Sequence, residues 1–549
     1  FLNYKIIPSL SFRSELGADI SNITEDQYIG VLASDALGKG AGSSFYTQDV
    51  SLNTNNYFTY TPKLGEDHTL SATAGMSYLQ NDFSTTQVSG ELFPSDIIKK
   101  LVAAASITYG NSNAQRYTFL SYFARANYAY KDKYLASVSV RSDGSSRFGP
   151  NNRFGVFPAA SLGWVVSEED FLKDNKTLSF LKLRASYGST GNAEIGENRY
   201  LTLLEPTSYP QLPGYRPRQM GNPDLKWEKT KQFDFGLEFG LFDSRLSGEV
   251  DYYNKQTSDL LLEANLPYTS GYDFQYLNIG NMENKGVEIA LNSVNINSRH
   301  FKWNTSLNVS YNKNKVKNIQ GQIIESTGGE QRAVEGEPIG VFYMAKFAGV
   351  EPETGDAFYI DDAGQPNPAF SKAQRMVVGK ATPDWTGGFT NTFSGYGFDL
   401  SVFFSFVQGN SIYNRAGIYQ DNGFAGGFDN QLRDVLNRWQ KPGDITNVPR
   451  LSYYFADGAS DNSSRWLYDG SYIRLKTLTL GYTLPASVIN ALKISGLRVY
   501  VAGYNLWTTT KYNGDPEINS DVLGNIAGGI DYYTVPQAKQ ITLGLNVKF

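Results

Sequence analysis

The side chains that most often carry catalysis or bind metal ions are rare in this sequence. The 549 residues contain no cysteine and two histidines, His68 and His300. The absence of cysteine excludes disulfide frameworks, thiolate zinc ligands and thiol nucleophiles. The two histidines lie far apart in the sequence, each beside a short turn between predicted strands. We therefore predict no catalytic residues, no metal site and no enzymatic activity.

Three short segments contain residue types that can bind phosphate, transfer protons or bind calcium, but their spacing is unsuitable. GKGAGS at 38–43 lacks the pattern of a phosphate-binding loop and is typical of a flexible loop. Glu168, Glu169 and Asp170 are adjacent carboxylates, and a solvated turn explains them better than acid–base catalysis does. TGDAFYIDDAG at 354–364 lacks the carboxylate spacing of a strong calcium loop. We predict no cofactor, and a bound cation in the last segment stays an open alternative.

Aromatic and polar side chains in the long predicted loops form the best candidate for a binding site. Aromatic faces stack on the CH faces of sugar rings, and neighbouring polar groups bond to the sugar hydroxyls. A small loop core or an interface with another protein is the alternative explanation for the same residues. The predicted substrate-binding residues are Tyr209, Tyr215, Arg216, Tyr413, Tyr419, Asp421, Asn422, Phe424 and Tyr453.

Alternation of apolar and polar residues dominates the rest of the sequence and predicts β-strands. In 304–311, for example, Leu307, Val309 and Tyr311 lie on one face, and asparagine and serine residues occupy the other. Such strands can turn one face to lipid and the other to water. No run reaches the ~18–20 apolar residues that a transmembrane helix needs. A membrane-spanning chain of this kind would therefore cross with strands.

Sixteen strands are predicted, and many are longer than the ~5–6 residues usual in soluble sheets. Short and long connections alternate, as in outer-membrane barrels, where periplasmic turns are short and extracellular loops long. The connection 147–152 is the one short member of the long set, and 168–178 and 485–496 are slightly longer members of the short set. A soluble sandwich gives no reason for this parity, which places the C-terminus in the periplasm. The predicted strands are 2–20, 51–63, 68–84, 113–130, 132–146, 153–167, 179–191, 227–242, 244–262, 280–297, 300–316, 384–395, 397–411, 470–484, 497–509 and 536–549. The long loops are 21–50, 85–112, 192–226, 263–279, 317–383, 412–469 and 510–535.

Composition and the last strand agree with a membrane barrel. Aromatic residues make up 14% of the chain and there are 53 glycines, which suits aromatic girdles and many turns. The formal net charge is −5 without a basic block, so we predict no nucleic-acid partner. The final strand alternates up to Phe549, an aromatic end that resembles the signal read by the barrel-assembly machinery.

Several motifs, in collinear order over nearly the whole chain, resemble the SusC family of TonB-dependent outer-membrane transporters (the SusC/RagA type). They are DGSSRFGPNNRFGVFPAASLGWVVSEEDFL (143–172), LKLRASYGSTGN (181–192), GNPDLKWEKTKQFDFGLEFGLF (221–242), VDYYNKQTSDLLL (250–262), NIGNMENKGVEIAL (278–291), GSYIRLKTLTLGYTLP (470–485), VYVAGYNLWTTTKYNGDPE (499–517) and the start of the last strand at Tyr533–Lys539. A series of motifs in one order is far more specific than any single motif.

The resemblance implies an all-β fold, an antiparallel up-and-down transmembrane β-barrel that occupies residues 1–549 as one domain. The family barrel has about 22 strands, and we expect this chain to hold about 16 C-terminal ones. The signal peptide, the plug domain, the TonB box and the first strands of the family have no counterpart in the sequence. We therefore expect the C-terminal portion of such a transporter.

The resemblance also implies a function, the active import of an oligomeric nutrient across the outer membrane of a Bacteroidetes-type bacterium. A glycan is favoured over a peptide as the substrate. The implied partners are a SusD-like surface lipoprotein, TonB acting through the plug region, outer-membrane lipid, and a second barrel–lipoprotein pair. A passive diffusion porin of sixteen strands is the main alternative, and a barrel hydrolase is a further one.

Overall fold

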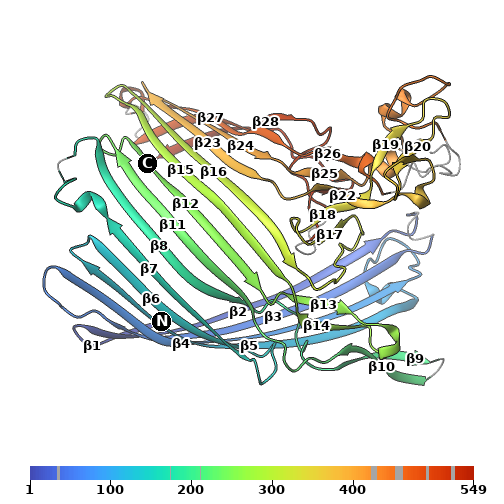
Figure 1. Ribbon diagram of the computed structural model, residues 1–549, viewed down its shortest axis with the longest axis horizontal. Helices are drawn as coiled ribbons and strands as arrows, with labels where there is room; N and C mark the ends of the chain where they lie inside the picture. Colours follow the sequence, from blue (N-terminus) through green and yellow to red (C-terminus); the bar gives the residue numbers. More distant parts are fainter. Residues whose placement is uncertain are drawn as a thin grey trace. The chain divides into compact units, whose positions relative to one another are not determined.

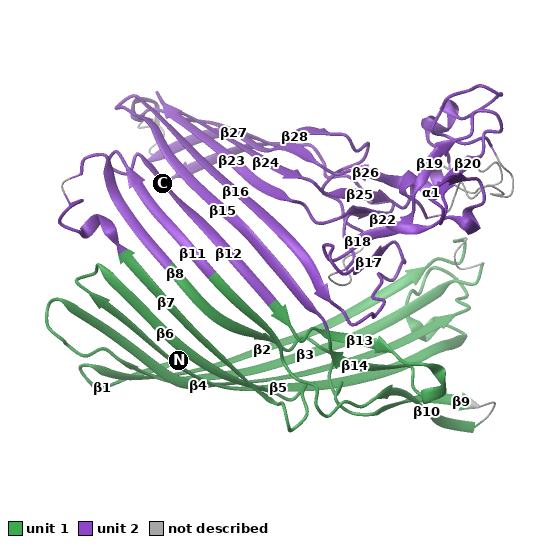
Figure 2. Ribbon diagram, viewed as in Figure 1, with its two compact units in different colours: residues 1–164, 185–233, 257–279 green, residues 165–184, 234–256, 280–549 purple. Residues whose placement is uncertain are grey.

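The fold consists almost entirely of β-strands, as the alternating pattern predicts (Figure 1). The computed structural model describes residues 1–33, 38–173, 175–209, 212–421, 430–451, 462–489, 494–520 and 526–549. The chain divides into two compact units, which Figure 2 colours separately. Unit 1 comprises 1–164, 185–233 and 257–279, and unit 2 comprises 165–184, 234–256 and 280–549. Among the described residues, no helix is long and apolar enough to cross a membrane.

Unit 1 contains an antiparallel meander in which each long strand pairs with the next one along the chain. The strands are β1 (Leu2–Ile7), β2 (Leu10–Ile29), β3 (Ala41–Tyr60), β4 (His68–Glu91), β5 (Ser106–Tyr130), β6 (Tyr134–Ser145) and β7 (Phe154–Val165). Strands β4 and β5 have 24 and 25 residues. They are therefore about twice as long as the ~9–11 residues that a tilted membrane strand requires.

Unit 2 contains a second meander with the same antiparallel pairing between successive long strands. Its strands are β15 (Asn281–Asn297), β16 (Phe301–Asn318), β23 (Trp385–Gly395), β24 (Phe398–Gln408), β27 (Tyr472–Thr483), β28 (Gly496–Thr510) and β30 (Gln540–Lys548). Strand β7 ends with one residue, Val165, in unit 2, and three further strands are divided between the units: β8 (Leu178–Asn192), β11 (Glu228–Leu241) and β12 (Leu246–Ser258). Each of the sixteen predicted strands overlaps one of these long strands.

The short connections confirm the tight turns that the sequence predicts. Strands β23 and β24 are joined by Tyr396 and Gly397, both with positive φ (52° and 86°). A two-residue hairpin turn of this kind matches the twist of the flanking strands, and glycine adopts it without steric cost. Lys131 and Asp132 also have positive φ in the turn between β5 and β6.

The predicted strand 2–20 is wrong, because β1 and β2 are two strands joined by a turn at Pro8 and Ser9. Proline has no N–H to donate to a β-ladder and favours turns. Pro8 was therefore a turn signal that the prediction of one continuous strand did not take into account. The loops 21–50 and 85–112 are also shorter than predicted, since the flanking strands extend far into both. In these extensions polar residues occupy both faces of the strands, so the apolar–polar alternation ends although the β-ladder continues.

The other long connections contain small sheets of their own. In unit 1, β9 (Leu203–Tyr209), β10 (Leu212–Met220), β13 (Leu261–Asn265) and β14 (Phe274–Asn278) form a four-stranded sheet. In unit 2 there are three three-stranded sheets: β17 (Gln331–Arg332), β18 (Val341–Ala345) and β22 (Arg375–Lys380); β19 (Phe347–Val350), β20 (Ala357–Ile360) and β21 (Pro366–Asn367); and β25 (Ser411–Asn414), β26 (Leu467–Asp469) and β29 (Ile530–Asp531). The short α-helices are α1 (Gly417–Gln420) and α2 (Ala486–Ile489), and 3-10 turns lie at Leu101–Ala103, Val166–Glu168, Tyr268–Ser270, Phe370–Lys372, Arg433–Asn437 and Ser464–Trp466.

Candidate functional site in the long connections

A buried core holds the long connections of unit 2 together. It consists of Phe342, Met344, Tyr413, Trp466 and Ile530, which come from β18, β25, β29 and the turn before β26. Tyr413 has no exposed surface, and its hydroxyl donates a hydrogen bond of 2.9 Å to Asn462 Oδ1. Burial raises the pKa of Tyr413, so the phenol stays neutral. This corrects the prediction of substrate contact for Tyr413: the ring belongs to a loop core, the alternative that the sequence left open.

Three tyrosines lie exposed beside one another in the same unit and form what we call the tyrosine cluster: Tyr419, Tyr532 and Tyr533. Tyr419 is 46% exposed at α1, and its ring centroid lies 6.2 Å from that of Tyr532 and 6.5 Å from that of Tyr533. Tyr532 and Tyr533 are exposed to a similar degree. Adjacent exposed rings offer apolar faces and hydroxyl groups to a ligand. Only Tyr419 was predicted, although the doublet of tyrosines at 532–533 was a visible signal.

Asp421 follows Tyr419 closely but is buried. Its backbone carbonyl accepts a hydrogen bond of 2.6 Å from Arg465 Nη2, and its Oδ1 atom has no hydrogen-bond partner among the described residues. Burial raises the pKa of Asp421 to about 6; nearby Arg465 opposes this rise, and Asp434 adds to it. A carboxylate so close to the exposed rings would lose or gain its charge near neutral pH.

We expect Asp421→Asn to stabilise α1 locally at pH 7 and to remove a pH dependence. In the unfolded segment the Asp421 carboxyl group loses its proton near pH 4. In the folded segment it keeps the proton up to about pH 6, because its pKa is raised. Local stability of the parent protein therefore falls as the pH rises from about 4 to about 6 and is flat above that. Over this pH range the free energy of local unfolding falls by about 3 kcal/mol at most. Hydrogen exchange of the amides at 417–421 at several pH values measures it, and equal exchange in both proteins would contradict the expectation.

The predicted residues of unit 1 lie on the hairpin of β9 and β10. Tyr215 is 76% exposed. Arg216 forms ion pairs with Glu205 and Asp273, the latter at 3.2 Å. Hydrogen bonds from Arg216 to Asp273 and then to Glu205 raise the arginine pKa. Arg216 thus helps to hold the hairpin, while Tyr215 stays accessible; Tyr209 ends β9, and its side chain is not described.

Three predicted contacts, Asn422, Phe424 and Tyr453, lie outside the described residues. They remain predictions. In unit 2, the calcium-like segment 354–364 contains strand β20 and ends in a turn, in which the Asp361 carboxylate accepts hydrogen bonds from the amides of Ala363 and Gln365. Within the described ranges, no group of three histidine, aspartate or glutamate side chains could hold a metal ion.

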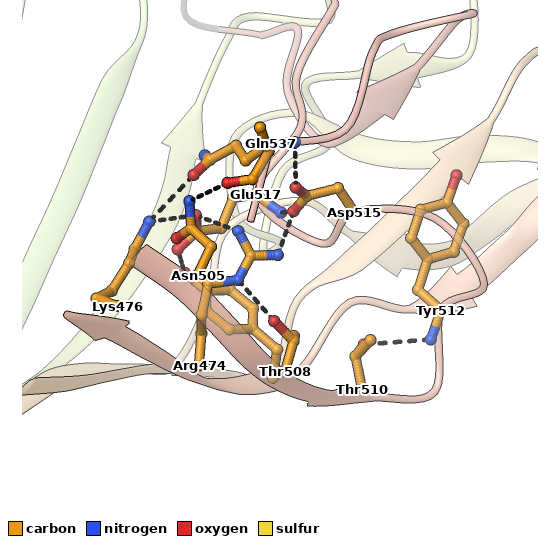
Figure 3. A network of polar contacts seen from close by, with 11 residues as sticks. Arg474, Lys476, Asn505, Thr508, Thr510, Tyr512, Asp515, Glu517 and Gln537 are labelled. Atoms are coloured by element: carbon orange, nitrogen blue, oxygen red, sulfur yellow. Dashed lines mark hydrogen bonds and ion pairs between the residues drawn. The ribbon is translucent and has the colours of Figure 1, made fainter. Parts of the chain in front are cut away.

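A buried charge network ties the end of the chain to β27 (Figure 3). Arg474 of β27 is 4% exposed and forms ion pairs with Asp515 and, at 2.7 Å, with Glu517. Lys476 also pairs with Glu517, and its Nζ reaches Gln537 Oε1 at 3.4 Å. Burial by itself raises the pKa of Asp515, but hydrogen bonds from Arg474 and two backbone amides outweigh this and lower it. The motifs around 512–519 and 533–539 thus serve structure here.

Comparison with known proteins agrees with this architecture. Residues 8–506 match the family described as TonB dependent receptor-like, beta-barrel. The TonB-dependent receptor P3 of Formosa agariphila is 36% identical over the whole chain, which covers 57% of that relative. SusC of Bacteroides thetaiotaomicron is 31% identical over 79% of the chain and 44% of its own length.

The solved structure of the RagAB peptide transporter aligns with 100% of the chain and 61% of the matched chain, at 30% identity and a TM-score of 0.87. The chain thus spans somewhat more than half of the length of the relatives that it matches in full. All three comparisons point to one family, and the chain belongs to the SusC-like TonB-dependent transporters of the outer membrane.

Proposed function

We propose that this chain is the C-terminal barrel portion of an importer that carries an oligomeric nutrient across the outer membrane, with glycan as the substrate class. The observation that carries the substrate class is the tyrosine cluster. Its three exposed rings lie in connections between long strands, and Tyr215 is a further exposed ring in unit 1. Family membership supports the transport function and counts against a passive porin.

The intact protein, in this proposal, contains a plug and the remaining strands of a barrel with about 22 strands. A SusD-like lipoprotein covers the extracellular mouth, TonB acts through the plug region, and two barrel–lipoprotein pairs associate. The C-terminus lies in the periplasm, because the short turns mark that side. Membership of a TonB-dependent family supports the coupling to TonB.

A peptide is the second candidate substrate, because the solved relative that aligns with the whole chain is named as a peptide transporter. Isothermal titration of the full-length protein with its lipoprotein partner separates the two classes. Oligosaccharides and oligopeptides are titrated in parallel. Tight binding of peptides alone would overturn the glycan proposal and leave the transport proposal intact.

Replacing Tyr419, Tyr532 and Tyr533 together by alanine is expected to weaken oligosaccharide binding at least tenfold. Each stacked ring contributes about 0.5–1.5 kcal/mol beyond the area that it buries. The matched control is Tyr396→Ala, since Tyr396 is even more exposed but lies in the short turn between β23 and β24. Unchanged affinity in the triple variant would show that the tyrosine cluster does not contact the ligand.

A further inference from the structure

One face of β15, β16 and β23 is apolar along most of its length. Residues directly opposite in an antiparallel sheet lie on the same face. Ile289 pairs with Val309, and Leu307 pairs with Phe389, so these four side chains share one face. Asn308 and the other polar residues between them lie on the opposite face. In a chain of this family, the apolar face is the one that suits lipid.

Aromatic pairs border this apolar face at both ends. The rings of Trp303 and Phe393 stack with centroids 5.6 Å apart, and those of Tyr311 and Trp385 lie 4.8 Å apart. Tyr311 lies eight positions after Trp303, which is about 26 Å along a strand and about 20 Å across a bilayer at a tilt of ~40°. Aromatic residues at this spacing mark the two membrane interfaces. The Tyr311 end adjoins the long connection 319–384, so it faces the outside.

Directly beyond the Tyr311 end lies a hollow lined by lysines, which we call the lysine pocket. It has a volume of about 580 Å³. Lys313, Lys315 and Lys317 continue the face of Tyr311 along β16, and Lys285 of β15 lies opposite Lys313. The lining contains five lysines against three carboxylates, so its formal charge is +2. The lining lysines are Lys285, Lys313, Lys315, Lys317 and Lys380, and the carboxylates are Glu283, Glu337 and Asp384.

Ion pairs within the pocket account for some of these lysines but not for all. Glu283 pairs with Lys317 at 3.0 Å and with Lys285 at 3.4 Å, and Lys380 pairs with Asp384. Lys313 and Lys315 form no ion pair or side-chain hydrogen bond within the part of the chain that the structure describes. Two ammonium groups therefore remain available beside a hollow wide enough for an anionic group.

We propose that the lysine pocket binds the phosphate of a lipid A-type headgroup in the outer leaflet. The pocket lies just above the aromatic border, where the headgroups of the outer leaflet lie. Ammonium groups form strong, charge-assisted hydrogen bonds with phosphate oxygens, and basic pockets at a membrane surface bind anionic headgroups. The apolar face below it accommodates the acyl chains of the same molecule. The proposal rests on the outer-membrane location of the family and not on which nutrient is imported.

The test uses the full-length protein, purified in detergent and freed of lipid, with its ligands measured by native mass spectrometry. The triple variant Lys285→Gln, Lys313→Gln, Lys315→Gln is expected to bind lipid A roughly a hundredfold more weakly, which is about fivefold per lysine. Lys302→Gln is the matched control for Lys313→Gln, because Lys302 is an exposed lysine at the opposite end of β16. The corresponding triple lysine-to-arginine variant keeps the charge and is expected to retain binding.

Lipid A from which the phosphates have been removed, and inorganic phosphate alone, identify the group that is recognised. Loss of binding with the dephosphorylated lipid supports the proposal. Equal binding of both lipids, or unchanged affinity of the triple glutamine variant, overturns it. Binding of inorganic phosphate at the pocket without any preference for the lipid also overturns it, since the source of the phosphate is then soluble. Heat-modifiable gel mobility confirms that each variant is folded, and loss of binding in a folded arginine variant also overturns the proposal, since that variant keeps the positive charge.

Discussion

Replacing Trp227 by alanine is expected to lower the free energy of unfolding of unit 1 by about 3–5 kcal/mol. Trp227 is almost completely buried, and its ring lies against Phe148 and Phe157 with centroids 5.2 Å and 5.5 Å away. Its indole N–H donates a hydrogen bond of 3.0 Å to the carbonyl of Arg153. Alanine leaves a cavity among these rings and removes the indole hydrogen bond, so that the carbonyl of Arg153 keeps only the one from the amide of Ser145. Urea titration of the protein refolded in lipid vesicles measures the change.

Trp227→Phe is the matched control, because it keeps an aromatic ring in the core and removes only the hydrogen bond and part of the volume. We expect a loss of about 1–2 kcal/mol for this variant. Hydrogen exchange at 145–157 and 222–228 would show whether the effect is local to the core. A loss below 1 kcal/mol for the alanine variant would mean that the core is not the element that holds these connections.

The Trp227 core brings together two motifs that lie far apart in the sequence. Phe148 and Phe157 come from the run 143–172, and Leu225 and Trp227 come from the run 221–242. Gly149 permits the two runs to approach, because a Cβ at this position would lie 2.7 Å from the carbonyl oxygen of Pro223. The sequence predicted a strand that begins at residue 227, but it could not show that the start of this strand packs against the earlier motif.

The strands could be predicted because lipid and water impose a period of two on their side chains. Where β16 crosses the apolar region, Leu307, Val309 and Tyr311 alternate with polar residues, and the predicted strand 300–316 closely matches β16. Outside that region, the side chains do not alternate between apolar and polar, so the sequence does not show where a strand begins or ends. Strand β3 begins at Ala41, ten residues before the predicted start. The prediction missed these ten residues because polar side chains occur on both faces of this part of the strand.

The candidate site could be predicted only in part, because connections have no period that separates buried from exposed rings. Tyr413 and Tyr419 are six residues apart in one connection, yet the first is fully buried and the second is about half exposed. Which ring enters the loop core depends on contacts with Phe342 and Trp466, which lie far away in the sequence. The same reason explains why Tyr532 was not predicted as a site residue.

Replacing Arg474 by alanine is expected to cost about 3–5 kcal/mol, because it leaves buried carboxylates without their cation. Asp515 is as buried as Arg474, at 4% exposure of each side chain, and Glu517 is nearly so. The affected segments are 512–519 and 533–539, which the network holds against β27 (Figure 3). Faster hydrogen exchange in both segments is the expected result.

Arg498→Ala is the matched control for Arg474→Ala. Arg498 forms two hydrogen bonds with the carboxylate of Asp399. The side chains of Arg498 and Asp399 are 27% and 39% exposed, so this pair is much less buried than the Arg474 network. An exposed pair of this kind contributes about 0–1 kcal/mol, so we expect little change. If the two variants lose equal stability, burial is not what makes the Arg474 network important.

The pH dependence of the Arg474 network provides a second, independent readout of the same interaction. The folded pKa of Asp515 lies below its ordinary value of 3.8, so its contribution is complete above about pH 4. As the pH falls through the folded pKa, this contribution is lost, and exchange at 512–519 should rise in the parent protein. Arg474→Ala removes the main cation that lowers this pKa, and the acid-induced rise should largely disappear. A rise of equal size in both proteins would show that Arg474 does not stabilise the charged form of Asp515, and the segment would then be held by its other contacts, such as the pair of Lys476 with Glu517.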